Sequence, residues 1–499
     1  MKNLFFALKD IPQSFYLLGG RILLGFGQLV MIRILTTFLE PAEIGKYYLL
    51  MSAISWISLF LIAPVNVYIS RHIHGWNNAG IAPVAVRNFI GFLSIISVLS
   101  ALFFFFIRRF SLLNLDISFS MAVLIVPLLI PAMTLSRLFP SLCNLLGKYR
   151  SFIVLSNMEV WGKLAAIFLF CSALSPSMET VLVAIVLWGI VVSVTAGFSL
   201  YRIMRKGSVA RHPFNSDFYK DVFRFSWPLA LGSALFWGQS EGYRFVLERT
   251  SGADFLGKFV VAYSLGAALM IAMDTLFHQL YMPVFYKEIS AETDASHIKA
   301  WNKYSKHLVG VCIPVGIYIA CAGPFLSYWL VAERYRSIGI YAAIGAFSQL
   351  FRILSAASYF GIVAQKNTTS LILPNALGAV MALAGTWYLS ETFPMLGTGV
   401  SLIASHILVC ILTYACLRAR LAVRIPWLRM VQATIWTLPI GLTLLMAYRL
   451  GWEARPATNA IVLLLTGGAM AYLQWKLSKN VWFQRELTQE GGPQRDASP

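Results

Sequence analysis

Four arginines that interrupt apolar runs are the residues in this sequence best suited to bind an anion. These four are Arg21, Arg33, Arg244 and Arg352. A guanidinium offers a rigid fork of N–H donors and keeps its charge when partly dehydrated, so it suits phosphate or carboxylate. Gln28 shares a helix face with Arg21 if the surrounding run is helical. We therefore predict that these five side chains bind an anionic head group.

Three acidic or basic side chains in the apolar runs could instead handle an ion. His278 follows Asp274 by four residues, which places both on one face of a helix, where the pair could exchange a proton. Glu241 precedes Arg244 by three residues and could pair with it or bind an ion. We predict that Asp274, His278 and Glu241 couple ion movement to the work of the protein.

Each of these residues also has a purely structural interpretation. A charge inside an apolar run can pair with an acid on its own helix or with a carbonyl and only hold a bundle together. Arg33 and Arg244 lie toward the ends of their runs, from which a long side chain can reach water. Glu159 and Lys163 are four residues apart, and we expect them to neutralise each other.

The elements that carry these residues must be membrane-spanning helices. The 499 residues are 58% hydrophobic and 12% charged, whereas about a quarter of a soluble protein is charged. Runs of about 20 apolar residues cross a bilayer as helices, because lipid offers no partner for backbone polar groups. We predict an all-α, polytopic membrane protein with about 14 spans, at 13–37, 44–69, 84–107, 117–137, 152–172, 178–202, 225–248, 256–285, 307–330, 338–363, 369–389, 396–417, 427–447 and 456–476.

The distribution of positive charge predicts the orientation. Most of the 40 Lys and Arg residues fall in alternate loops, which is the pattern of a topology signal and not of a nucleic-acid surface. Both termini are then cytoplasmic, and the loops leave no room for a soluble catalytic domain, so we predict no enzymatic activity. The six cysteines show no metal-ligand spacing, and neither a metal nor a cofactor is expected.

An internal repeat predicts the domain organisation. The segment from Gly27 to Tyr47 matches the segment from Gly238 to Phe259 with one inserted residue, and 148–157 aligns with 366–375. Each half begins on the cytoplasmic side, so the two six-helix lobes are parallel repeats. The predicted parts are an amphipathic N-terminus (1–12), an N-lobe (13–202), a basic linker (203–224), a C-lobe (225–417), a terminal helix pair (427–476) and a disordered cytoplasmic tail (477–499).

Two segments carry a resemblance to a known family. They are RILTTFLEPAEIGKYYLLMSAISW with the later VYISRHI, and FSWPLALGSALFWGQSEGYRFVLERTSGADFLGKFVVAYSL. Both resemble Wzx-type polysaccharide flippases of the multidrug/oligosaccharidyl-lipid/polysaccharide (MOP) exporter superfamily. The resemblance implies two lobes around a cavity that opens alternately to either side of the bacterial inner membrane. It also implies transport of an oligosaccharide on undecaprenyl pyrophosphate to the periplasmic leaflet.

The same resemblance implies the partners. These are the lipid-linked oligosaccharide, membrane lipids, H⁺ or Na⁺ as a coupling ion, and the polymerase or assembly proteins of O-antigen or exopolysaccharide pathways. Two relatives remain as alternatives, a peptidoglycan lipid-precursor flippase and a MATE-type drug antiporter. An antiporter of cationic drugs needs an acidic or aromatic pocket, whereas basic residues outnumber acidic ones in these spans. A membrane polymerase or glycosyltransferase would need periplasmic acidic residues or a large loop, and neither occurs here.

Overall fold

The computed structural model describes residues 13–109, 118–119, 121–204, 216–289, 293–365 and 368–489. Every regular element within these ranges is a helix, which confirms the all-α prediction. The predicted N-terminus (1–12) lies outside the described residues. So do 205–215 of the predicted linker and 490–499 of the predicted tail.

The helices run the length of the apolar sequence. In chain order they are α2 (Gln13–Phe38), α3 (Pro41–Ile57), η1 (Ser58–Ile62), α4 (Ala63–Asn78), α5 (Ala82–Arg109), η2 (Met121–Ile125), α6 (Val126–Leu145), α7 (Tyr149–Ala173), α8 (Met178–Ile203), α9 (Ser216–Ser240), α10 (Tyr243–Ile289), α11 (Asp294–Leu330), η3 (Glu333–Tyr341), α12 (Ala342–Ala364), η4 (Thr368–Leu371), α13 (Ile372–Ser390), α14 (Pro394–Arg418), α15 (Trp427–Arg449), η5 (Trp452–Ala454) and α16 (Pro456–Gln489).

Twelve helical segments of the described chain are long and apolar enough to cross a membrane. One of them, Phe218–Ile289, contains both the seventh and the eighth predicted spans. A shorter apolar helix, Ile22–Phe38, covers most of the first predicted span. The chain is therefore a multi-pass membrane protein, as predicted, and each predicted span contains helix.

Several predicted span boundaries differ from the observed helices. α9 begins at Ser216, inside the predicted linker, and α16 continues to Gln489, into the tail that the sequence predicts to be disordered. Hydropathy predicts the fourth span at 117–137, but the apolar helical segment runs over Val123–Leu145 and places Arg137 inside it. The ninth span is predicted at 307–330, whereas α11 begins at Asp294. Hydropathy ends a span at the first charge, but a helix continues for as long as its backbone hydrogen bonds are satisfied.

The connection between the seventh and eighth spans is also more complex than predicted. α9 ends at Ser240 and α10 begins at Tyr243, but α10 is interrupted at Gly252, whose φ is +84°. Only glycine adopts that conformation without strain. The chain therefore changes direction at Gly252, close to the boundary that hydropathy predicts.

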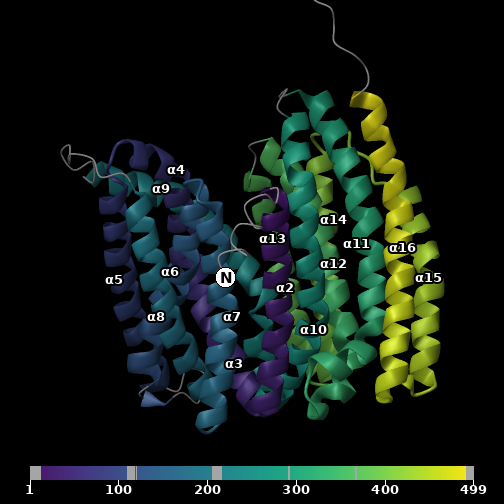
Figure 1. The fold of residues 1–499 in the computed structure, drawn as a ribbon, viewed down its shortest axis with the longest axis horizontal. Helices are drawn as coiled ribbons and strands as arrows, with labels where there is room; N and C mark the ends of the chain where they lie inside the picture. The colour runs from purple at the N-terminus through teal and green to yellow at the C-terminus, as the bar shows by residue number, and fades with distance from the viewer. Residues whose placement is uncertain are drawn as a thin grey trace, which may run out of the picture. The chain divides into compact units, whose positions relative to one another are not determined.

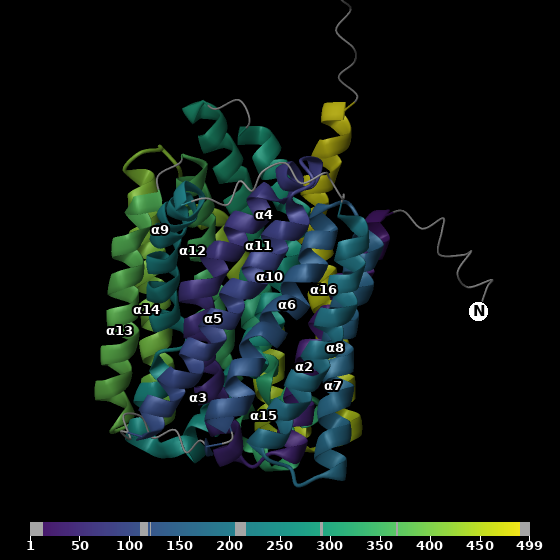
Figure 2. The same ribbon diagram turned by 90° about the vertical axis from the view of Figure 1, so that its left-hand side faces the viewer.

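The contacts divide the chain into two compact units. Unit 1 holds Met1–Val261, Leu330–Ala332 and Asn375–Ser405, and unit 2 holds Ala262–Trp329, Glu333–Pro374 and His406–Pro499. These units follow packing, whereas the predicted lobes follow the sequence repeat, so the lobe boundaries stay a prediction. In unit 1, α6, α7 and α8 pack side by side, with α2 against α7 and α5 against α6 (Figures 1 and 2).

Glycines allow the helices of unit 1 to approach closely. A Cβ atom at Gly27 of α2 would lie 2.3 Å from the Cγ1 atom of Val160 on α7. A Cβ at Gly162 of α7 would lie 2.0 Å from the indole of Trp188 on α8. In lipid, where helices gain little from hydrophobic burial against each other, such close packing is a main source of association.

The core of unit 2 lies among α10, α11 and α12 and includes Trp301, Leu308 and Ile353. The backbones of α10 and α12 touch, because a Cβ at Gly266 would lie 2.0 Å from the carbonyl oxygen of Ala342. This contact holds together the helices that carry Asp274, His278 and Arg352.

Within unit 2, polar contacts join the terminal pair, α15 and α16, to α11 and to each other. Trp329 of α11 donates a hydrogen bond to the side-chain oxygen of Asn459 on α16 at 2.9 Å, and Asn459 donates to the carbonyl of Phe325 at 3.2 Å. Arg429 of α15 donates to the carbonyl of Leu477 at 2.7 Å.

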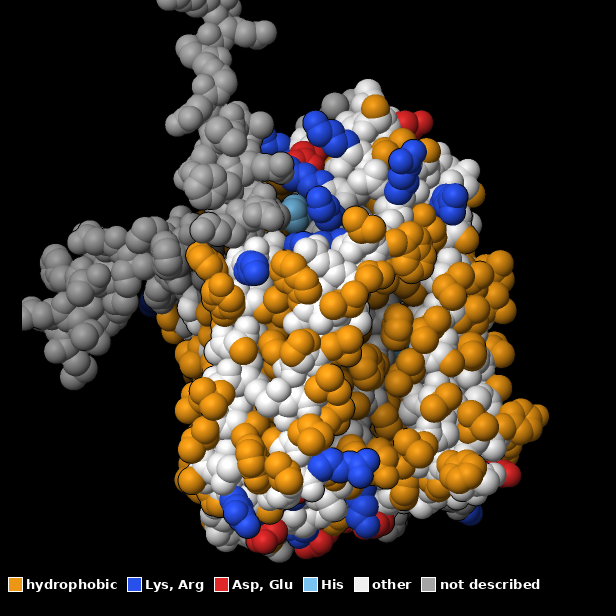
Figure 3. Space-filling view, turned by 90° about the vertical axis from the view of Figure 1, so that its right-hand side faces the viewer, with side chains coloured by type: hydrophobic (Ala, Val, Ile, Leu, Met, Phe, Trp, Pro, Cys, Tyr) orange, Lys and Arg blue, Asp and Glu red, His pale blue; other side chains and the backbone are white. Residues whose placement is uncertain are grey.

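Figure 3 shows a face with hydrophobic side chains over its middle and Lys and Arg toward its two ends, as a membrane-embedded surface requires.

Candidate functional site

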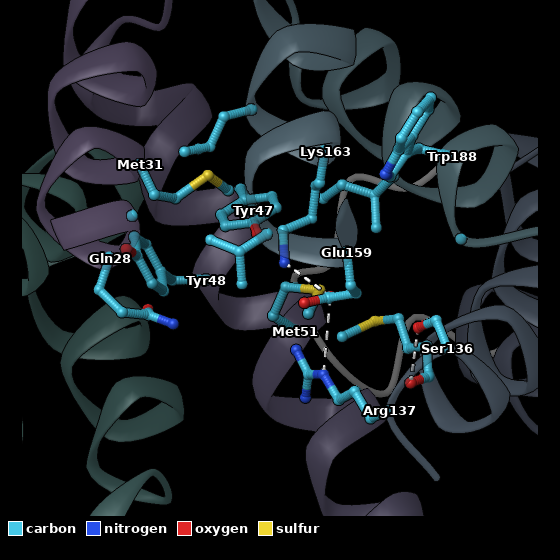
Figure 4. Close-up of a pocket in the computed structure, with 16 residues that line it drawn as sticks. Gln28, Met31, Tyr47, Tyr48, Met51, Ser136, Arg137, Glu159, Lys163 and Trp188 are labelled. Carbon is cyan, nitrogen blue, oxygen red and sulfur yellow. Dashed lines mark hydrogen bonds and ion pairs between the residues drawn. The ribbon is translucent and has the colours of Figure 1, made fainter. Parts of the chain in front are cut away.

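Unit 1 contains a cavity of about 190 Å³ bounded by α2, α3, α6, α7 and α8 (Figure 4). We call it the N-terminal cavity. Its walls are formed by Gly27, Gln28, Met31, Tyr47, Tyr48, Met51, Met133, Ser136, Arg137, Glu159, Val160, Lys163, Leu164, Ile185, Trp188 and Gly189.

Two cations converge on one carboxylate in the N-terminal cavity. Lys163 Nζ lies 2.9 Å from Glu159 Oε1, which confirms the pair that the i,i+4 spacing predicts. Arg137 Nε approaches the same oxygen at 3.9 Å (Figure 4). Because two positive groups share one negative group, the cluster keeps a formal charge of +1.

Arg137 is a functional candidate that the sequence alone does not reveal. Its side chain is 61% exposed, although it lies well inside the apolar segment Val123–Leu145. A guanidinium at such a position is stable only toward water or a polar partner, because exposure to lipid is costly. We therefore expect the exposed part of Arg137 to face water or a polar ligand.

The opposite wall of the cavity is polar and aromatic. Gln28 of α2, one of the predicted binding residues, is exposed and lines the cavity. Tyr48 of α3 lines the same side. Trp188 is fixed at the other side because its indole N–H donates to the carbonyl of Met158 at 2.9 Å.

Arg244 and Glu241 form the local ion pair that their spacing predicts. Arg244 Nη1 lies 3.3 Å from Glu241 Oε2 and donates to the Ser52 hydroxyl at 2.7 Å. The hydroxyl of Ser55 donates to the same carboxylate oxygen at 2.7 Å. This network links α3 to the start of α10, and both charged groups are occupied by protein partners.

The guanidinium of Arg244 also lies over the ring of Tyr48, 5.4 Å from its centroid. Because Tyr48 lines the N-terminal cavity, Arg244 sits behind the cavity wall and not among the lining residues. The attraction between a cation and a ring face holds this tyrosine in place.

Arg33 lies elsewhere in unit 1. It donates a hydrogen bond from Nη1 to the carbonyl of Val331. The Thr36 hydroxyl, one turn further along α2, accepts from the N–H of Ala332 at 3.1 Å. Arg33 is therefore bonded to the short segment 330–332. For Arg21, the structure describes its place on α2, but the side chain lies outside the described residues.

The second polar cluster lies in unit 2. His278 Nδ1 is 2.8 Å from both the carboxylate Oδ1 and the backbone carbonyl of Asp274. Its other nitrogen, Nε2, is 3.2 Å from the hydroxyl of Tyr304 on α11. The four-residue spacing thus predicts the Asp274–His278 pair correctly, and the contact with Tyr304 extends it to a second helix.

Arg352 lies in the same unit, on α12. Its Nε donates to the side-chain oxygen of Gln349, whose amide donates to the hydroxyl of Tyr263 at 3.2 Å. Its helix, α12, touches the backbone of α10, which carries Asp274 and His278. The predicted residues therefore fall into separate groups within the two units.

Comparison with known proteins identifies the fold. No family model matches the sequence, and no curated protein matches it. Among solved structures, the lipid II flippase MurJ in its inward-closed conformation superposes with a TM-score of 0.68 at 10% identity, over 95% of this chain and all of that one.

Two structures of multidrug resistance MATE transporters of the MOP superfamily are also similar. The inward-facing one has a TM-score of 0.61 at 12% identity, covering 81% of this chain and 94% of that one. The outward-facing one has a TM-score of 0.55 at 13% identity, covering 83% and 97%. The chain therefore has the fold that these flippase and MATE structures share.

Proposed function

We propose that this chain is a flippase that carries an undecaprenyl-pyrophosphate-linked oligosaccharide from the cytoplasmic to the periplasmic leaflet of the bacterial inner membrane. The observation that supports this most is the excess positive charge of the N-terminal cavity, where Arg137 and Lys163 share the single carboxylate Glu159. A site with a net positive charge inside a membrane suits an anionic cargo, since the ligand then compensates the charge.

In this proposal, the anionic head group enters from the cytoplasm while the prenyl tail stays in lipid. Arg21 and Gln28 of unit 1 bind the head group, and Arg352 provides a separate contact for it in unit 2. Arg33 and Arg244 are bonded to protein atoms in this conformation, and they reach the cargo only when those bonds are exchanged during alternating access.

The proposal assigns ion coupling to unit 2. Asp274 and His278 lie at ion-pair distance on one face of α10, and Tyr304 extends the chain of polar groups to α11. A histidine next to a carboxylate can take up and release a proton near neutral pH. Glu241 of unit 1 is the second candidate for coupling, because its carboxylate, which accepts hydrogen bonds from Arg244 and Ser55, could bind an ion if either of them moved.

A peptidoglycan lipid-precursor flippase is the second candidate function. The superposition that covers all of the lipid II flippase chain favours it. Both candidates share the carrier chemistry and differ in the sugar and peptide groups of the cargo. A MATE-type antiporter of cationic drugs is less favoured, because the cations of the N-terminal cavity would repel its substrate.

The orientation of the chain in the membrane determines where it meets its partners. We place both termini in the cytoplasm, because the positive loops predict that orientation. The cargo would then meet polymerase or assembly proteins of an O-antigen or exopolysaccharide pathway at the periplasmic face.

Cells that lack this chain provide the test. If the proposal is right, undecaprenyl-linked oligosaccharide accumulates in them on the cytoplasmic side, where a membrane-impermeant periplasmic label does not reach it. Re-expression of the unmodified chain restores labelling. Normal periplasmic labelling in the deleted cells, or accumulation of lipid II alone, would overturn the proposal, and lipid II accumulation would support the second candidate.

A further inference from the structure

We propose that the N-terminal cavity is a subsite for one acidic monosaccharide of the cargo, with the sugar carboxylate bound by Arg137 and Lys163. This inference rests on the proposed function and specifies the class of glycan that it carries. It differs from pyrophosphate binding, which the sequence assigns to other arginines.

Charge is the first property of the cavity that favours such a ligand. The cluster of Arg137, Lys163 and Glu159 has one cation more than it has anions. A bound carboxylate would make the site neutral, because the two cations, Arg137 and Lys163, would then face two anions, Glu159 and the ligand. Buried charges are tolerated when each has an oppositely charged or hydrogen-bonding partner. The site therefore favours a ligand with a single negative charge.

The presence of Glu159 distinguishes a sugar from a pyrophosphate. With Glu159 ionised, the cluster has a net charge of +1, which one sugar carboxylate neutralises, whereas the two or more negative charges of a pyrophosphate would leave the site net negative. The hydroxyls of a sugar are donors and suit the Glu159 carboxylate well. The side chain of Glu159 is only 14% exposed, so the group is held at the cavity wall and not in open water.

The size and lining of the cavity agree with a single sugar ring. Its 190 Å³ corresponds to about six waters at their share of liquid volume. Tyr48 and Trp188 supply aromatic surface on two sides, and Gln28 supplies an amide that can both donate and accept. This combination of ring faces, amide and charge provides both apolar and polar contacts for one sugar.

The cavity is also held open by its frame. Close packing at Gly27 and Gly162 fixes α2 and α8 against α7, and the bond from Trp188 to Met158 fixes the indole. A site whose walls are already positioned loses little entropy when the ligand binds. This favours binding of a small rigid ligand such as a sugar ring.

The test measures binding to the purified full-length protein in lipid nanodiscs by titration calorimetry. The probes are glucuronate, glucose and inorganic pyrophosphate. We expect glucuronate to bind about tenfold or more tightly than glucose, because one additional hydrogen bond to a charged group changes the affinity by about that factor. Pyrophosphate should not displace it at equal concentration. Equal affinity for glucuronate and glucose, no glucuronate binding, or displacement by pyrophosphate would overturn the proposal.

Variants locate the site. R137Q and K163Q should each weaken glucuronate binding about tenfold or more, whereas R87Q, at an exposed arginine of α5 outside the cavity, should leave it unchanged. Because E159Q raises the net charge of the cluster, it should shift the preference from glucuronate toward pyrophosphate. Thermal unfolding of each variant shows whether it is folded. If R137Q or K163Q does not fold, E159Q and the comparison of sugars on the unmodified protein decide the question.

A flipping assay separates this inference from the proposed function. Proteoliposomes are loaded with undecaprenyl-pyrophosphate glycans that differ only in one glucuronate or glucose unit. Faster transport of the acidic glycan supports both proposals. Equal transport of both glycans refutes the subsite and leaves the flippase function intact. Glucuronate binding without transport of either glycan supports the subsite and refutes the function.

Discussion

Gly45 and Gly257 occupy matching positions in the two halves of the sequence, and each is packed against the backbone of the other's segment. A Cβ atom at Gly45 would lie 1.9 Å from the carbonyl oxygen of Ala253, and one at Gly257 would lie 1.9 Å from that of Pro41. The starts of α3 and of the part of α10 after Gly252 therefore cross at their glycines. Both glycines belong to the internal repeat that the sequence predicts.

The first prediction concerns this crossing. G45A and G257A should each lower the thermal stability of the purified protein, because the added methyl group has no room and overpacking costs about 1–3 kcal/mol. The control is G91A on α5, where no atom lies within 4 Å of the position that the added methyl group would take. It should leave the melting temperature unchanged or raise it. A G45A protein as stable as G91A would show that the crossing is not tightly packed.

The second prediction separates two roles of Arg244. If it mainly pairs with Glu241, R244Q should destabilise the protein by on the order of 3 kcal/mol, since removal of one partner leaves a partly buried charge unpaired. The double variant E241Q/R244Q should recover part of that loss. A thermal-unfolding double-mutant cycle measures the coupling. If R244Q is as stable as the unmodified protein but does not transport, Arg244 acts on the cargo.

The third prediction concerns the Asp274–His278 pair. D274N and H278Q should each abolish the acceleration of flipping by an imposed pH gradient, because each removes one member of the proton-exchanging pair. Flux in proteoliposomes with and without the gradient measures this. H297Q, at a histidine near the start of α11, is the control. Acceleration that persists in D274N would place coupling elsewhere.

The fourth prediction concerns Arg352. R352Q should reduce apparent affinity for the lipid-linked cargo about 10- to 100-fold, which corresponds to the loss of one or two charged hydrogen bonds. R352K should retain part of the affinity, because it keeps the charge and loses the fork geometry. Initial flipping rates against cargo concentration provide the measurement. An unchanged KM in R352Q would show that Arg352 only holds Gln349 and its neighbours in place.

Hydropathy predicts the helices of this protein well, because lipid requires a helix wherever a long apolar run occurs. It predicts the ends less well. α11 starts at Asp294, in a polar stretch that projects beyond the apolar run, and hydropathy contains no signal for that extension. The same limitation places the end of the fourth predicted span at Arg137, although the helix continues to Leu145.

Pairs within one helix are the part of the site that the sequence predicts. Glu159 with Lys163 and Asp274 with His278 follow from a spacing of four residues. Contacts between helices, such as Arg137 with Glu159, depend on how the helices pack, and a single sequence does not contain that information. The signal that could have found Arg137 is its position before the largely apolar stretch 138–146 (LFPSLCNLL), which favours a continuing span.

A reconstituted flipping assay tests the proposed transport of lipid-linked glycan without the rest of the cell. Undecaprenyl-pyrophosphate oligosaccharide with a fluorescent sugar is placed in proteoliposomes that contain the purified chain, and an impermeant quencher reports the leaflet. We predict time-dependent movement of the glycan that depends on the protein and is reduced in R352Q, with no movement of a cationic dye. Dye transport without glycan movement, or glycan movement at the rate of protein-free liposomes, would show that the chain is not this flippase.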